Sequence, residues 1–275
     1  MSKLQIGIPC GPNSESYVNF LIENIIRTVS DVDNVEILLG INKPNLDIDF
    51  MTQYRDVLDI KVVEAISEYY LSRGHGHCLD TMFEHMDSEY AMIVDCDVAF
   101  LQKDWDIKLI NELKDDVVII GAGTEISHHH YYDFPFTITT LFKVAPLKEV
   151  GVSFMPKLKD IILTEENAEV FGRNPGDKIH LDTAWELPYK LKPAGYSGKA
   201  LPIISPRVSK DEVVFLSDNM RGEEHHLNGV PIFTHVGRSS NRDFHRDPVV
   251  TTWTARVENW VDNLDKILEN KNDKV

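Results

Sequence analysis

The sequence has few cysteines, a shortage of positive charge and no long apolar run, and each shortage excludes a class of protein. Its three cysteines are odd in number and lack CxxC spacing. This excludes a disulfide framework and a structural zinc site, and indicates a reducing compartment. No apolar run approaches the roughly 20 residues that span a bilayer, and the first apolar stretch is too short for a secretion signal. We therefore expect a cytoplasmic protein without a membrane span, made in the host cytosol if it is of viral origin.

The shortage of positive charge argues against polyanionic partners. Lys and Arg number 28 against 44 Asp and Glu, a formal net charge of −16 with His neutral. Such a chain repels nucleic acid and acidic membrane surfaces. To bind an anionic small ligand, such a chain would need a local source of positive charge, such as a metal ion or a helix N-terminus. The composition, 43% hydrophobic and 26% charged over 275 residues, is that of a soluble globular protein with a sizeable core.

Apolar segments of strand length alternate with helical patterns over the first 120 residues. The predicted strands cover residues 4–9, 34–40, 60–65, 90–94 and 117–120. Helical spacing of apolar residues is found over 18–29, 78–86 and 105–113, with a Gly-rich turn at 72–77. The alternation predicts an α/β fold, with a mostly parallel central sheet and helices on both faces. In such sheets ligands bind at the C-terminal ends of the strands.

After residue 120 aromatic residues, prolines and turns replace this alternation, and we expect an α+β half that folds onto the same sheet. Apolar residues from Trp253 to Ile267 predict a C-terminal amphipathic helix. No repeat, low-complexity stretch or linker separates two domains. The prediction is a single domain over 1–275, divided into residues 1–120, residues 121–247 and a C-terminal helix at 248–270.

Two aspartates directly follow the apolar strand at residues 90–94. In extended backbone alternate residues point to the same side, so Asp95 and Asp97 share a small space at the expected ligand-binding edge. Two anions that close are unfavourable unless a proton or a cation lies between them, and hard oxygen ligands suit Mg²⁺ or Mn²⁺. His235, after a short apolar run, is a candidate third ligand that favours Mn²⁺ somewhat. The structural alternatives are two solvated aspartates and a hydrogen-bonded core histidine.

As an ordered set, these features resemble the nucleotide-sugar-dependent glycosyltransferases of the GT-A fold, similar to family 2. The set comprises the first strand and helix, the Arg73-Gly74 turn, the strand YAMIVDCDVAF with its DxD motif, the acidic segment HLDT at 180–183 and the late histidine in HVGR. The resemblance implies a GT-A-like, Rossmann-like fold. Residues 1–120 would then bind the nucleotide sugar and residues 121–247 the acceptor.

The resemblance also implies an activity. A hexosyltransferase of this type moves a sugar from a UDP, GDP or dTDP donor to an acceptor hydroxyl, such as that of a glycan. A metal held by Asp95, Asp97 and His235 would bridge the diphosphate and stabilise the charge of the leaving group. The chain contains neither a QxxRW motif nor membrane segments, which argues against a processive polysaccharide synthase.

Further donor contacts follow from the same resemblance. The expected donor-binding residues are Pro9, Cys10, Arg73, Gly74, His77, Asp80, Asp95, Cys96 and Arg238. For the four residues between 73 and 80, turn and helix-cap roles are an equally good interpretation.

An inverting transfer needs a base that takes the proton of the acceptor hydroxyl, whereas a retaining transfer does not. Asp182, at the start of a predicted helix over 182–191, is the first candidate, and Glu186 is the substitute. A helix N-cap is the structural alternative for Asp182. The acceptor-binding candidates are His130, Asp133 and Trp185. A second metal site and a surface loop that packs its tyrosines are the other interpretations of residues 128–134.

Three other functions share part of this pattern. A haloacid-dehalogenase-like phosphatase also places DxD after an apolar strand, but here three strands precede the motif and Val98-Ala99 follows it. A sugar nucleotidyltransferase shares the sheet and the metal, but its Gly-rich loop is usually basic, and residues 11–15 contain no Lys or Arg. A non-enzymatic carbohydrate-binding protein would not need the aspartate pair. We therefore expect a metal-dependent glycosyltransferase.

Overall fold

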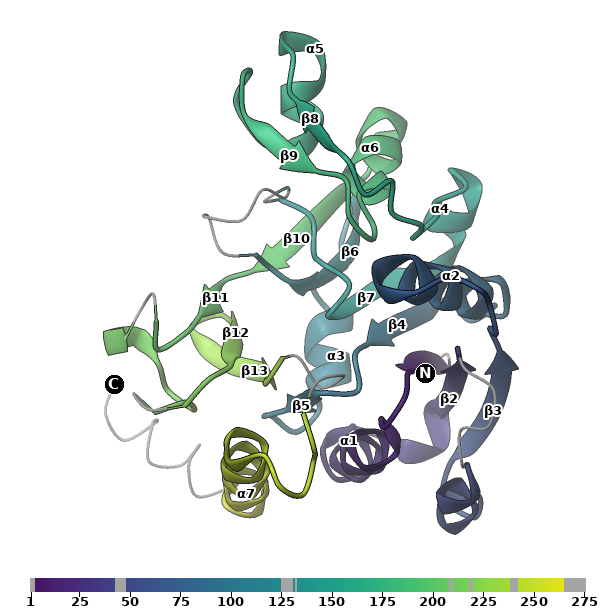
Figure 1. Cartoon of the computed structure of the whole chain (residues 1–275), viewed down its shortest axis with the longest axis vertical. Coiled ribbons are helices and arrows are strands. Elements are labelled where there is room, and N and C mark those ends of the chain that lie inside the picture. The colour runs from purple at the N-terminus through teal and green to yellow at the C-terminus, as the bar shows by residue number, and fades with distance from the viewer. Residues whose placement is uncertain are drawn as a thin grey trace.

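The computed structural model describes residues 3–42, 48–124, 131, 133–207, 210–217, 220–237 and 242–264. A seven-stranded sheet forms its centre, in the order β10-β6-β7-β4-β1-β2-β3 (Figure 1). The strands are β1 (Leu4–Cys10), β2 (Val35–Ile41), β3 (Asp59–Glu64), β4 (Tyr90–Val94), β6 (Val117–Ala122), β7 (Thr139–Lys143) and β10 (Ser197–Leu201). The five strands predicted before residue 121 are confirmed to within two residues at either end.

The central sheet is mostly parallel, as predicted. Parallel pairings join β1 to β2 and β4, β2 to β3, and β6 to β10. Only β7 runs against its neighbours β4 and β6 among these strands. Because β7 and β10 come from the second half of the chain, that half completes the sheet that the first half begins.

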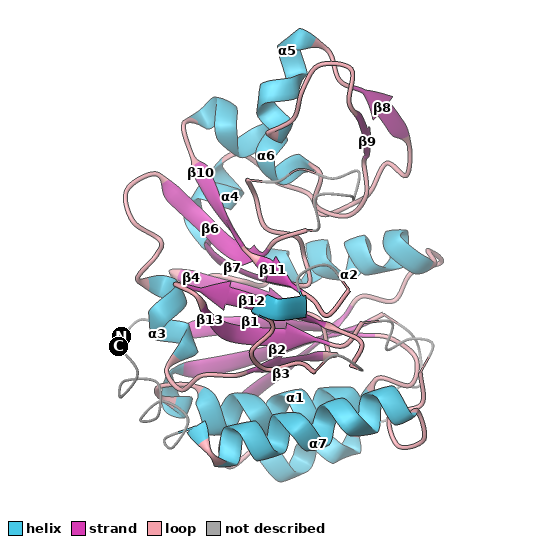
Figure 2. Cartoon of the chain, turned by 90° about the vertical axis from the view of Figure 1, so that its left-hand side faces the viewer, coloured by secondary structure: helices cyan, strands magenta, loops and turns pink. Residues whose placement is uncertain are grey.

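Helices cover both faces of the sheet (Figure 2). The helices α1 (Glu15–Thr28), α3 (Trp105–Ile110) and α7 (Pro248–Asp262) pack in one apolar cluster with the inward residues of β1 and β2. The helices α2 (Leu71–Glu84), α4 (Val144–Glu149), α5 (Glu165–Ala168) and α6 (Glu186–Leu191) pack in a second cluster on the opposite face. All seven residues of β1 and of β2 are buried because helices cover both faces of the sheet, which explains why most of their side chains are apolar.

A second, four-stranded antiparallel sheet adjoins the first. Its order is β11-β12-β13-β5, built from β5 (Val98–Phe100), β11 (Ile203–Ile204), β12 (Glu223–Leu227) and β13 (Val230–His235). A separate ribbon pairs β8 (Asp160–Ile162) with β9 (Lys178–His180). Short 3₁₀ turns occupy η1 (Val32–Asn34), η2 (Asp49–Tyr54), η3 (Glu169–Phe171), η4 (Lys192–Ala194) and η5 (Lys210–Glu212). Since only three residues separate the end of β4 from the start of β5, the short segment between these two strands connects the two sheets.

The predicted Gly-rich turn at 72–77 is wrong, because these residues form the first part of α2. Here the glycines serve close packing. A Cβ on Gly76 would lie 2.8 Å from the carbonyl oxygen of Phe154, and a Cβ on Gly74 would lie 2.9 Å from that of Tyr69. Glycine is therefore required inside a helix, where its sequence signal suggests a turn.

Two predicted helix bounds also differ from the structure. The helix expected from residue 182 begins only at Glu186, after a turn in which Ala184 has a φ of +64°. The C-terminal helix α7 begins at the predicted Pro248 and ends at Asp262, and residues 265–270 of the prediction lie outside the described part. In the part of the chain that the structure describes, no helix combines the length and apolar character needed to cross a bilayer.

Candidate functional site

Asp95 and Asp97 lie between β4 and β5, at the carboxyl end of β4. The main chain holds both of them: the amide of Asp95 donates to the carbonyl of Ile138 at 2.8 Å, and the amide of Val236 donates to the carbonyl of Asp97 at 3.1 Å. The antiparallel register of β13 on β5 places His235 opposite Val98. Sheet pairing therefore brings a histidine from near the end of the chain beside the aspartate pair.

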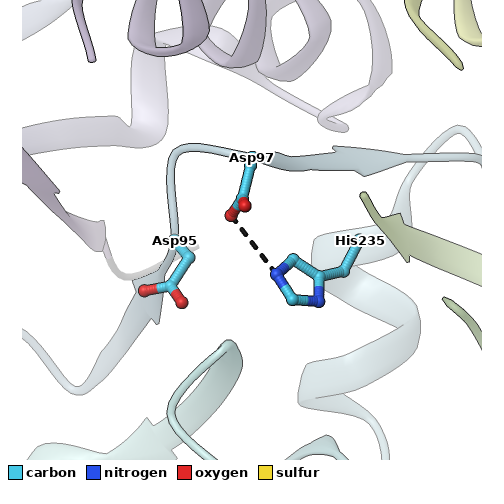
Figure 3. Close-up of side chains that lie close together, drawn as sticks. All are labelled: Asp95, Asp97 and His235. Atoms are coloured by element: carbon cyan, nitrogen blue, oxygen red, sulfur yellow. Dashed lines mark ion pairs between the residues drawn. The ribbon is translucent and has the colours of Figure 1, made fainter. Parts of the chain in front are cut away.

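The three side chains converge on one space (Figure 3). The Nε2 atom of His235 lies 3.3 Å from Oδ1 of Asp97. One ligand atom from each of Asp95, Asp97 and His235 lies within 4.8 Å of the other two. Two carboxylates and an imidazole form a donor set that fits Mn²⁺ or Mg²⁺. The structure thus brings together the three residues predicted as metal ligands.

The electrostatics of this cluster favour a cation. Burial lowers the pKa of His235, but the carboxylates of Asp97 and Glu223 outweigh burial and raise that pKa well above its usual value. A proton on the ring compensates the buried negative charge of Asp97. A metal ion and this proton would compete for the same nitrogen.

His75 in α2 also belongs to the cluster, and the sequence analysis missed it. Its Nε2 lies 3.3 Å from Oδ1 of Asp95. Burial lowers the pKa of His75, and the carboxylates of Asp95, Asp182 and Asp97 together raise it above its usual value. His75 was missed because residues 72–77 were predicted to form a turn and not a helix. In a helix, His75 shares a face with Cys78 and Leu79, three and four residues on, which pack towards the sheet.

Glu223 in β12 is the second residue that the sequence analysis missed. Its Oε2 lies 3.5 Å from Nδ1 of His235, on the opposite side of the ring from Asp97. Burial raises the pKa of Glu223, but the hydrogen bond and charge of His235 prevail and lower it.

Most of the expected donor residues lie in two elements, β1 and α2. Pro9 and Cys10 end β1, and the buried Cys10 thiol, whose pKa burial raises, directs its Sγ to the carbonyl of Ile8 at 3.4 Å. Arg73, Gly74, His77 and Asp80 lie in α2, where the Asp80 carboxylate accepts bonds from the amide of Phe154 at 2.6 Å and the hydroxyl of Ser153 at 2.7 Å. Asp80 thereby anchors the segment after α4. Cys96 is buried between the two aspartates, and Arg238 lies outside the described residues.

A cavity of about 530 Å³ opens at the start of α1. It is lined by Asn13, Glu15, Ser16, Arg242, Asp243, Phe244 and His245. The adjoining Tyr17 has a raised pKa because it is buried, and the charge of Asp97 contributes to that rise. The lining of the cavity carries acidic side chains and the cationic side chain of Arg242.

On the acceptor side, Asp182 is the carboxylate that the structure brings towards the cluster. The charge of Asp182 contributes to the raised pKa of His75. Burial is the main cause of the raised pKa of Tyr131, and the charge of Asp182 adds to it. The amide of Thr183 donates to its Oδ1 at 2.8 Å. The N-cap position of α6 is Trp185, so Asp182 does not act as the cap that was its structural alternative.

The other predicted acceptor-side residues have structural partners. Glu186 accepts from the amide of Ser153 at 3.1 Å and pairs with Lys190 at 2.7 Å. Trp185 is 5% exposed, and its Nε1 donates to the carbonyl of Met155 at 3.1 Å. Asp133 pairs with Lys192 in a cavity of about 550 Å³ next to α5, and His130 lies outside the described residues.

No family model and no curated protein matches the sequence. Solved structures match its fold. The mannosyltransferase PcManGT from Pyrobaculum calidifontis, solved with GDP-Man and Mn²⁺, has a TM-score of 0.53 at 14% identity over 73% of this chain and 55% of that chain. TarS from S. aureus, residues 1–349, has a TM-score of 0.44 at 18% identity over 66% of this chain and 57% of that one.

The fold is that of the GT-A-type nucleotide-sugar glycosyltransferases, which confirms the predicted fold class. The likeness to PcManGT carries this conclusion. The chain spans 55% of that protein's length, and at 14% identity the likeness establishes the fold alone. It favours neither the phosphatase nor the nucleotidyltransferase.

Proposed function

We propose that the protein is a metal-dependent glycosyltransferase that moves a sugar from a nucleoside diphosphate to an acceptor hydroxyl. The convergence of Asp95, Asp97 and His235 at the carboxyl end of β4 carries the proposal. The GDP-Man and Mn²⁺ in the PcManGT structure support it. The three side chains would hold Mn²⁺ or Mg²⁺, which when bound supplies positive charge for the diphosphate leaving group.

Residues of this chain bind and orient the donor around that cluster. The end of β1 at Pro9 and Cys10, the turn at Cys96 and the α2 residues Arg73, Gly74 and His77 border the donor. His75, whose pKa is raised, adds positive charge beside Asp95. A chain with net charge −16 requires such local cations to hold an anionic substrate.

In an inverting reaction Asp182 acts as the base. The acceptor oxygen forms a bond to the anomeric carbon while the bond from that carbon to the diphosphate breaks, and the hydroxyl proton passes to the Asp182 carboxylate. Asp182 is preferred to Glu186 because Glu186 is engaged by Ser153 and Lys190.

We further propose that the sugar is a hexose, that the acceptor is a glycan and that the protein works in the cytoplasm. The hexose and the glycan rest on the sequence resemblance, and the GDP-Man of PcManGT agrees with a hexose. The cytoplasm is supported by the cysteines, since Cys10, Cys78 and Cys96 are all buried and none of them forms a disulfide.

Calorimetry with UDP-, GDP- and dTDP-sugars, each with Mn²⁺ and with a chelator, tests the function. We expect one nucleotide to bind and to require the metal, and Asp95→Asn to abolish that binding. The matched control is Asp56→Asn, an exposed aspartate before β3. Release of phosphate from a phosphomonoester, lost in Asp95→Asn, would instead establish the phosphatase.

A further inference from the structure

We propose that Glu223 is a positioning residue that fixes the ring of His235 with Nε2 directed into the metal cluster. This inference rests on the proposed metal site. Glu223 in β12 stands directly opposite His235 in β13. Its Oε2 lies 3.5 Å from Nδ1, whereas Nε2 lies 3.3 Å from Oδ1 of Asp97. The two ring nitrogens thus face two different carboxylates, one inside the candidate metal cluster and one outside it.

The chemistry of imidazole gives this arrangement a consequence. A neutral ring carries a hydrogen on one nitrogen and a lone pair on the other, and the contact at one nitrogen decides the state of the other. An ionised carboxylate can only accept, so Glu223 favours the hydrogen on Nδ1. When a metal ion lies between Nε2 and Asp97, the lone pair on Nε2 is then available to bind it. Carboxylates placed in this way hold the ring of a metal-binding histidine and raise its basicity.

The hairpin around the ring is built to hold this contact. Glu223 is largely buried, its Oε1 lies 3.9 Å from the Arg207 guanidinium, and the Thr234 hydroxyl donates to its carbonyl at 2.9 Å. The next residue, Glu224, is engaged elsewhere, because its carboxylate accepts from the amides of Val214 at 2.6 Å and Phe215 at 2.7 Å. Only Glu223 of this acidic pair is aimed at His235.

Two glycines lie close to His235. A Cβ on Gly222 would lie 3.0 Å from the carbonyl oxygen of His235, and a Cβ on Gly237 would lie 3.4 Å from Cε1 of its ring. Both glycines also have positive φ, at +135° and +71°. The chain therefore approaches the carbonyl of His235 at Gly222 and its ring at Gly237, and the carboxylate of Glu223 faces the ring at Nδ1.

Mn²⁺ affinity, measured by electron paramagnetic resonance on the full chain without donor, tests the inference. We expect Glu223→Ala to weaken binding about 10–100-fold relative to wild type. Glu223→Gln keeps an oxygen that accepts from Nδ1, so it should recover part of the affinity. The matched control is Glu258→Ala on the exposed side of α7, which should bind as wild type does. Circular dichroism checks that each variant is folded.

The outcomes separate this inference from the function on which it rests. If wild type binds Mn²⁺ and a folded Glu223→Ala binds it equally tightly, the positioning role is overturned and the metal site stands. If wild type binds no Mn²⁺, the metal site itself is overturned, and this inference with it.

A second measurement needs no variant. Long-range ¹H–¹⁵N spectra of the wild type loaded with Mg²⁺ should show His235 with its hydrogen on Nδ1 and none on Nε2. A hydrogen on Nε2 would contradict the proposal.

Discussion

At the scale of single residues, the candidate site holds two carboxylates close together, and their negative charges must be balanced. Asp95 and Asp97 are neighbours in space, and each has a histidine against it: His75 at 3.3 Å from Asp95 and His235 at 3.3 Å from Asp97. Protonated imidazoles balance the carboxylates when no other cation is present. A divalent ion balances the same charges with stronger bonds, so metal binding should raise the free energy of unfolding.

The first prediction concerns this gain in stability. Mn²⁺ at about 100 times its dissociation constant should stabilise the wild-type protein by about 2.7 kcal/mol, because only the folded state assembles the three ligands. Asp95→Asn should remain folded and lose this gain. The free energy of unfolding, measured in urea with and without Mn²⁺, checks it, with Asp56→Asn as the control that keeps the gain. An Asp95→Asn protein that Mn²⁺ stabilises as much as wild type would contradict the assignment.

The second prediction concerns Asp182. Asp182→Asn should lower the rate of sugar transfer by about 10²-fold or more while leaving metal-dependent donor binding unchanged, because a base acts on the acceptor proton and not on the donor. Parallel turnover and donor calorimetry measure the two effects. Unchanged turnover removes Asp182 from the role.

The third prediction is a pH dependence. The pKa of His235 is raised in the folded protein, so its ion pairs contribute fully below its unfolded pKa of about 6.5. That contribution is lost as the pH rises through the higher folded pKa. In metal-free protein, the stability advantage of wild type over His235→Gln should therefore shrink as the pH rises above about 6.5. Urea unfolding at several pH values measures it. An advantage that grows with pH would be opposite to the expected sign.

At the scale of elements, the sequence predicts best the strands that are buried on both faces of the sheet. β1, β2 and β4 are apolar runs, and all were predicted to within about a residue. The start of α2 was predicted wrongly because its glycines are needed for close packing. Gly76 packs against Phe154, which is distant in the sequence, so no local pattern reveals the contact. His75 was missed for that reason.

The β12–β13 hairpin shows a second limit. Asn228 and Gly229 have φ values of +52° and +77°, as expected of a tight hairpin turn, and this pair was available as a signal. Counting back from the turn would place Thr234 opposite Glu223. A register shift between His225 and His226 moves the pairing by one residue and puts His235 there instead. The sequence alone therefore predicts the hairpin but not which residue lies opposite Glu223.

The fourth prediction concerns α2. Gly76→Ala should destabilise the protein by about 1–3 kcal/mol, because the added Cβ would lie 2.8 Å from the Phe154 carbonyl and 2.8 Å from Cδ of Pro156. This outweighs the better helix propensity of alanine. The free energy of unfolding in urea is the measurement.

Gly11→Ala is the control for that prediction, since nothing lies within 4 Å of a Cβ at residue 11. It should be neutral or slightly stabilising. Equal effects of the two substitutions would show that packing against α2 is not the reason for Gly76.

At the scale of the whole molecule, two sheets meet at the candidate site. The parallel sheet supplies Asp95 at the end of β4, the antiparallel sheet supplies His235 at the end of β13, and the turn between β4 and β5 joins them. The aspartate pair could be found from the sequence, because its two residues are local. His235 could be named from the sequence as a candidate ligand, but no local pattern gives its approach to the aspartates, because that depends on the pairing of β13 with β5, far apart in the chain.

The most direct measurement of the central claim is an anomalous diffraction map from a crystal of this protein soaked in Mn²⁺. We expect a peak within coordination distance of a carboxylate oxygen of Asp95, a carboxylate oxygen of Asp97 and Nε2 of His235. A well-diffracting crystal with no peak between these three side chains, or with one bound through Nδ1, would contradict it.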